Sequence, residues 1–214
     1  MPASGVDLYW LPLGAGGHFV RLNGRAYEAL VALRERRPAR DLYHSALVVR
    51  LAGERFVVEV APIPDRHGAR RGAVTEGPVG ARWAGRWRIF RYEVRRWPAG
   101  SISDVDEAVE SPRRLTGDER CARRLLDLVP DLPPLVWGRD ELGTGEMWNC
   151  NSVISWLIAR SGIAGAPVRP PAGGRAPGWQ AGLTLAQRQA AATGAGPHDP
   201  ARRPEAVHRV AHHH

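Results

Sequence analysis

The sequence of 214 residues contains no lysine, so all 30 of its basic residues are arginine. It has only two cysteines, Cys121 and Cys150, which are too few for a disulfide framework. The N-terminus lacks the basic and apolar segments of a secretory signal. No run approaches the roughly 20 apolar residues of a membrane span. These absences predict a cytoplasmic protein with reduced thiols and no transmembrane helix.

The charge is strongly positive, with a formal net charge of +8 and a pI near 10.8. Such an excess is typical of nucleic-acid binders. Here, however, exclusive use of arginine with abundant Ala, Gly and Pro is also typical of a GC-rich coding bias, and the arginines are spread along the chain. We do not expect nucleic acid to be a partner. An arginine-rich nucleic-acid binder is therefore kept only as the least favoured function.

The pattern of apolar residues predicts alternating strands and helices. We expect strands over residues 6–14, 42–51, 55–63 and 86–97 and helices over residues 24–37, 116–130 and 150–162. The intervals 65–85, 102–115 and 131–146 are expected to be loops, the second with a short helical piece. This order favours an α+β fold in which helices pack on one side of an antiparallel sheet.

The composition changes after the last expected helix. Residues 164–214 are rich in Pro, Gly and Ala and offer few side chains to bury. We therefore predict a single α+β domain over residues 1–163, followed by a largely disordered tail with at most a short helix at 184–192.

Cys150 opens the expected helix in "WNCNSVISWLI". The N-terminal end of a helix has unpaired N–H groups and a positive dipole, which lower a thiol pKa and can hold an oxyanion. Asn149 either caps this helix or donates to that oxyanion. The alternative is that Cys150 is a buried core residue. Cys121, in "DERCARRLL", is expected to be a helix packing residue.

His44 is the internal histidine best placed to serve as a base, because it opens the strand "HSALVV". Folding the hairpin about residues 52–53 places Ala46 opposite Glu59, within a register step of His44. A carboxylate inside the apolar run "FVVEVAP" is explained by a role in orienting His44. The alternatives are that His44 bonds a loop and that Glu59 pairs with an arginine.

An early strand opening "YHSAL", a hairpin partner with a polar residue and a late "NC" starting a buried helix resemble the circularly permuted papain-like fold. This is the branch of the NlpC/P60 superfamily that includes the lecithin:retinol acyltransferase-like proteins. The resemblance covers residues 40–162 and implies that Cys150 is the nucleophile, His44 the general base and acid, and Glu59 the third member. Two features depart from it: "NSV" follows the cysteine where that branch has "EHF", and Glu59 stands where His, Asn or Gln is usual.

The resemblance implies a thiol hydrolase or acyltransferase that acts on an amide or ester bond through an acyl-cysteine intermediate. Its substrate would be a small molecule, a peptide or a lipid-like acyl compound. No cofactor or metal is expected, since the histidines lack ligand spacing. The alternative is a non-catalytic binding or scaffold protein of the same fold.

Overall fold

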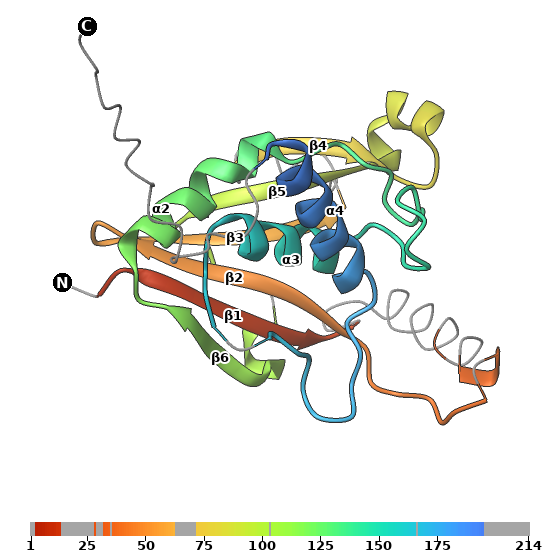
Figure 1. Cartoon of the computed structure of the whole chain (residues 1–214), viewed down its shortest axis with the longest axis horizontal. Helices are drawn as coiled ribbons and strands as arrows, with labels where there is room; N and C mark the ends of the chain where they lie inside the picture. The colour runs from red at the N-terminus through yellow and green to blue at the C-terminus, as the bar shows by residue number, and fades with distance from the viewer. Residues whose placement is uncertain are drawn as a thin grey trace, which may run out of the picture.

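The structure is a computed structural model and describes residues 3–13, 28, 32–34, 36–62, 72–102, 104–165 and 167–194. Its strands are β1 (Gly5–Pro12), β2 (Tyr43–Leu51), β3 (Glu54–Pro62), β4 (Ala73–Pro78), β5 (Arg91–Pro98) and β6 (Val109–Thr116). Its α-helices are α2 (Glu119–Leu128), α3 (Cys150–Arg160) and α4 (Trp179–Ala192). The strands form one six-stranded antiparallel sheet in the order β4-β5-β3-β2-β1-β6 (Figure 1).

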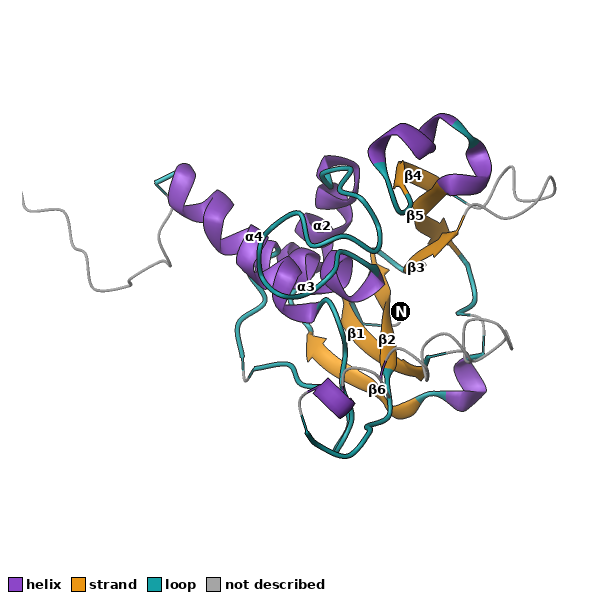
Figure 2. Ribbon diagram, turned by 90° about the vertical axis from the view of Figure 1, so that its right-hand side faces the viewer, coloured by secondary structure: helices purple, strands orange, loops and turns teal. Residues whose placement is uncertain are grey.

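Helices α2, α3 and α4 cover one face of this sheet (Figure 2). The main core lies between them and the sheet, where residues such as Leu47, Leu125 and Ile154 are fully buried. A smaller apolar cluster on the opposite face includes Leu11 and Val48. The predicted mixed fold, with helices on one side of an antiparallel sheet, is confirmed at this level.

The β2–β3 hairpin forms as predicted. Its turn residues, Ala52 and Gly53, both have positive φ, 52° and 86°, the backbone that favours a tight two-residue hairpin. The pairing runs from Leu51 opposite Glu54 to Leu47 opposite Val58, which is the predicted register.

Helix α3 also forms as predicted, with a capping box at its start: the Asn149 side chain accepts N–H groups of the first turn while the Ser152 hydroxyl accepts the Asn149 N–H. Gly162, at φ 79°, follows its end. Helix α2 lies within the predicted helix 116–130 and begins after Asp118, whose carboxylate accepts the N–H of Arg120.

Two strands lie where loops are expected. β4 falls within the predicted loop 65–85, and β6 falls within the predicted loop 102–115 except for its last residue, Thr116. β4 and β6 are the edges of the sheet, and β6 ("VESPRRLT") carries charges and a proline that are tolerated only there. The predicted strand 86–97 begins only at Arg91, because residues 82–90 form short 3₁₀ turns.

The prediction of a disordered tail is wrong for residues 167–194, which belong to the fold. Helix α4 packs against α3 and buries Ala181, Gly182 and Ala186. The remainder of that prediction, residues 195–214, lies outside the described residues. So does most of the predicted helix 24–37, of which Glu28 and residues 32–34 are described and helical. In the described part of the chain, no helix is long and apolar enough to cross a bilayer.

Candidate functional site

The start of α3 is bonded to the start of β2 through Asn151, which is 2 % exposed. The Ser45 hydroxyl donates to Asn151 Oδ1 at 2.8 Å. Asn151 Nδ2 in turn donates to the carbonyl oxygens of Tyr43 and Pro177, each at 2.9 Å. Two segments that are more than a hundred residues apart in the sequence therefore meet.

Segment 174–178 completes this arrangement. The Tyr43 N–H donates to the Arg175 carbonyl at 2.8 Å, which bonds this segment to β2. The Ser152 hydroxyl donates to the Gly178 carbonyl at 2.7 Å, which bonds it to α3. Three segments meet at this place, which we call the junction: residues 41–45, 149–152 and 174–178.

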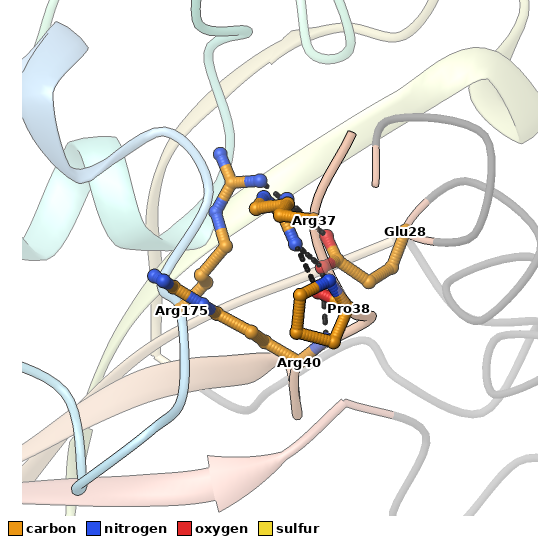
Figure 3. A network of polar contacts seen from close by, with 5 residues as sticks. All are labelled: Glu28, Arg37, Pro38, Arg40 and Arg175. Atoms are coloured by element: carbon orange, nitrogen blue, oxygen red, sulfur yellow. Dashed lines mark hydrogen bonds and ion pairs between the residues drawn. The ribbon is translucent and has the colours of Figure 1, made fainter. Parts of the chain in front are cut away.

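The buried carboxylate of Glu28 bonds the residues that precede β2 and also lies beside segment 174–178 of the junction. Glu28 is 2 % exposed; it accepts from the Arg37 guanidinium and the Arg40 N–H, and it lies 3.5 Å from Arg175 Nη1 (Figure 3). Burial opposes ionisation of Glu28, but these hydrogen bonds and the two guanidiniums outweigh it and hold its pKa below the ordinary value. Glu28 thus ties the chain that leads into β2 to segment 174–178.

The thiol of Cys150 lies at this junction and is buried, with 8 % of the residue exposed. Burial raises the thiol pKa to about 11, although the backbone N–H groups of Ser45, Asn151 and Cys150 itself act to lower it. The sulfur is therefore next to the backbone of the residue that follows His44. At neutral pH it is a thiol rather than a thiolate.

The side chain of His44 belongs to the other face of the sheet. Successive side chains of a strand alternate between faces. In β2, Leu47 and Val49 lie in the core under the helices, whereas Ala46 and Val48 lie in the cluster on the opposite face. Position 44 shares the parity of Ala46 and Val48, and therefore their face.

The neighbours of His44 agree with this placement. It pairs across the ladder with Leu11, a member of the cluster on the opposite face, and its charged neighbour is Asp104. Burial lowers the imidazole pKa to about 4, against a smaller opposing effect of the Asp104 carboxylate. Within the described residues, no hydrogen bond joins this ring to the sulfur of Cys150.

Glu59 is engaged with arginine, which is the alternative that its sequence left open. It lies opposite Arg95 in the β3–β5 ladder, and its carboxylate is 3.2 Å from the Arg95 guanidinium. Arg95 also bonds Glu93, and both of these residues are about 95 % buried. The structure thus places Glu59 in a buried charge cluster with Glu93 and Arg95, rather than on the ring of His44.

Asn149 serves as the helix cap. Its Oδ1 accepts the N–H groups of Asn151 (2.9 Å) and Ser152 (3.4 Å), and its Nδ2 donates to the Pro177 carbonyl at 2.9 Å. Of its two predicted roles, the structure therefore shows capping. Cys121 donates to the Gly162 carbonyl at 3.6 Å, a contact between α2 and the end of α3.

Asn151, which bonds both β2 and segment 174–178, is not among the site residues predicted from the sequence. A signal was present, because Asn151, Ser152 and Ser155 interrupt the apolar run of a helix whose first nine residues are all buried. Buried polar side chains need partners, and in this structure those partners come from β2 and segment 174–178.

We expect Asn151→Ala to lower the free energy of unfolding by about 2 kcal/mol, because it leaves the buried Tyr43 carbonyl and Ser45 hydroxyl without their partner. Chemical denaturation at neutral pH measures this loss. Gln187→Ala, at an exposed position of α4, is the control and should change stability by less than about 0.5 kcal/mol. An equal effect of the two variants would contradict the role of Asn151.

The described residues contain no group of three or more His, Cys, Asp or Glu side chains placed to hold a metal ion. At the junction, the thiol of Cys150 lies beside the backbone N–H groups of Ser45 and Asn151, whereas the imidazole of His44 belongs to the other face of β2. No protein-family model, no curated protein and no solved structure matches this chain.

Proposed function

We propose that this chain is a non-catalytic binding protein with a permuted papain-like fold. The meeting of the histidine-bearing strand and the cysteine-bearing helix at the junction supports the fold. The alternation of β2, which places the His44 ring on the face of the sheet opposite α3 and the Cys150 thiol, supports the absence of catalysis and is the observation that carries the proposal. The pKa directions of both groups agree with it.

An imidazole with a pKa of about 4 does not remove the proton of a thiol with a pKa of about 11 to any useful extent. Near neutral pH both groups are uncharged, and the parity of β2 directs the ring away from α3. Papain-like catalysis requires a thiolate beside an imidazolium. The residue expected to orient the ring, Glu59, is held by Arg95.

A thiol hydrolase or acyltransferase is the second candidate, because three backbone N–H groups surround the sulfur of Cys150. Such donors stabilise an oxyanion on an acyl substrate. In that case the His44 ring would have to reach the sulfur and its pKa would have to rise.

Alkylation of Cys150 by iodoacetamide distinguishes the two candidates. A thiol with a pKa of about 11 holds about 300-fold less thiolate at pH 7 than an ordinary thiol of pKa 8.5. We therefore expect Cys150 to react at least about 100-fold more slowly than free cysteine at pH 7. Because only the thiolate reacts, and its fraction rises about tenfold per pH unit below the pKa, the alkylation rate should rise by the same factor towards pH 11.

Peptide mass spectrometry assigns the labelled site, and the Cys121→Ser variant leaves Cys150 as the one thiol in the chain. Rapid labelling of Cys150 at pH 7, with a rate that levels off near neutrality and falls in His44→Ala, would overturn the non-catalytic proposal in favour of the enzyme.

A further inference from the structure

The connection between β4 and β5 carries an exposed group of aromatic side chains. The Val79 N–H donates to the Phe90 carbonyl at 2.8 Å and closes the base of this connection. Residues 82–90, "RWAGRWRIF", form two short 3₁₀ turns in which Ala84 alone is buried. We call them the aromatic loop; Figure 1 shows it in yellow, standing clear of the sheet beside the end of β4.

The apolar side chains of the aromatic loop face solvent. Trp83, Trp87, Ile89 and Phe90 are 67 %, 44 %, 78 % and 43 % exposed. The rings form one continuous group, since Trp87 makes edge contacts with Trp83 at 5.7 Å and with Phe90 at 6.3 Å between centroids. Exposed apolar groups of this kind mark interaction surfaces.

The same loop is basic. It contains Arg82, Arg86 and Arg88 and no acidic residue. The Arg86 guanidinium lies 4.1 Å from the centre of the Trp87 ring, and Arg82 pairs with Glu141 at 2.7 Å. Arg86 and Arg88 are both exposed. The loop therefore presents positive charge together with the apolar group, on a chain whose net charge is +8.

We infer that the aromatic loop binds the surface of an anionic lipid bilayer. Tryptophan and arginine partition to the bilayer interface, where apolar rings enter the acyl boundary and guanidiniums meet lipid phosphates. This charge complementarity favours an anionic surface over a neutral one. The anionic bilayer would be the partner of the proposed binding function, and this assignment of a partner rests on that function.

Two observations favour lipid over single-stranded nucleic acid. Arg86 occupies a face of Trp87, which a base would need for stacking. The most exposed apolar residue of the loop, Ile89, is aliphatic and offers no ring on which a base could stack. An aliphatic side chain beside tryptophan is instead typical of interfacial membrane contacts.

Sedimentation of the full chain with phosphatidylcholine vesicles, with and without phosphatidylserine, tests the inference. We expect binding to the anionic vesicles that weakens at high salt. Trp83→Ser/Ile89→Ser should weaken it by at least about tenfold, because it removes two side chains that would enter the bilayer. Arg86→Gln/Arg88→Gln should weaken it by about 25-fold at low salt, about fivefold per arginine.

Matched controls lie elsewhere on the surface. Leu33→Ser replaces an apolar residue that is 77 % exposed, and Arg120→Gln/Arg123→Gln removes two exposed arginines of α2. These variants should bind as the parent chain does, and thermal unfolding confirms that every variant is folded. The inference is overturned by absence of vesicle binding, by equal loss in the control variants, or by retention on single-stranded DNA that the loop substitutions abolish while vesicle binding persists.

Lipid binding and the lack of catalysis fail separately. Rapid alkylation of Cys150 would reject the non-catalytic function and leave vesicle binding unaffected, because the aromatic loop and the junction share no residue.

Discussion

Replacing Arg95 with methionine is expected to lower the free energy of unfolding by about 3 to 5 kcal/mol at neutral pH. Arg95 is 4 % exposed and pairs with the carboxylates of Glu59 on β3 and Glu93 on its own strand β5. Removing the guanidinium leaves two neighbouring negative charges that burial keeps from full hydration. The cost arises from those uncompensated charges rather than from the loss of one ion pair.

Arg91→Met is the matched control for this variant. Arg91 lies on the same strand and pairs with Glu76 at 3.0 Å, but both side chains are more than a third exposed, at 38 % and 34 %. Its loss should cost no more than about 1 kcal/mol. Denaturant titration compares the two variants, and the triple variant Arg95→Met/Glu59→Gln/Glu93→Gln should recover much of the lost stability. If Arg95→Met costs no more than Arg91→Met, the buried cluster does not stabilise the fold.

The elements that could be predicted from the sequence are those with strong local signals. The turn at residues 52–53 set the register of the β2–β3 hairpin, and Asn149 marked the start of α3. Each of these signals acts through neighbouring residues, so no knowledge of the remaining chain was needed.

The edge strands and the C-terminal segment lacked such signals. β6 contains charges and a proline that read as a loop, and its strand conformation depends on pairing with β1. Helix α4 is rich in Ala and Gln, and a segment with so few large apolar side chains gives no sign in the sequence that it packs into a core. Its small residues are buried because α3 packs directly against them, so that a Cβ at Gly182 would overlap the Ser152 carbonyl oxygen. No local sequence pattern reports this contact.

The candidate site was only partly predictable for a related reason. β2 and α3 meet through Ser45 and Asn151 rather than through His44 and Cys150. The run "ALVV" of β2 is apolar on both faces, with Leu47 and Val49 on one and Ala46 and Val48 on the other. A strand buried on both sides gives no alternation from which to read the face of His44. Nor could the sequence tell which of 30 arginines would reach Glu59.

Replacing Gly182 with valine is expected to lower the free energy of unfolding by about 3 kcal/mol, because it forces α4 away from α3. A Cβ at this position would overlap the carbonyl oxygen of Ser152 and the hydroxyl of Ser155. The carbonyl belongs to helix backbone and has no room to move. The intrinsic preference of a helix for side chains other than glycine, at most about 1 kcal/mol, does not offset this overlap.

Gln187→Val is the control, since it places the same side chain on the exposed face of α4. Denaturant titration of both variants should show a loss for Gly182→Val and little change for Gln187→Val. Because segment 174–178 leads directly into α4 and bonds the start of α3 through Asn149 and Ser152, displacing α4 should also open the junction. Alkylation of Cys150 should then become faster in Gly182→Val and stay slow in Gln187→Val. If Gly182→Val is as stable as the parent chain and its thiol as slow to react, α4 does not close the junction and the folded unit ends before it.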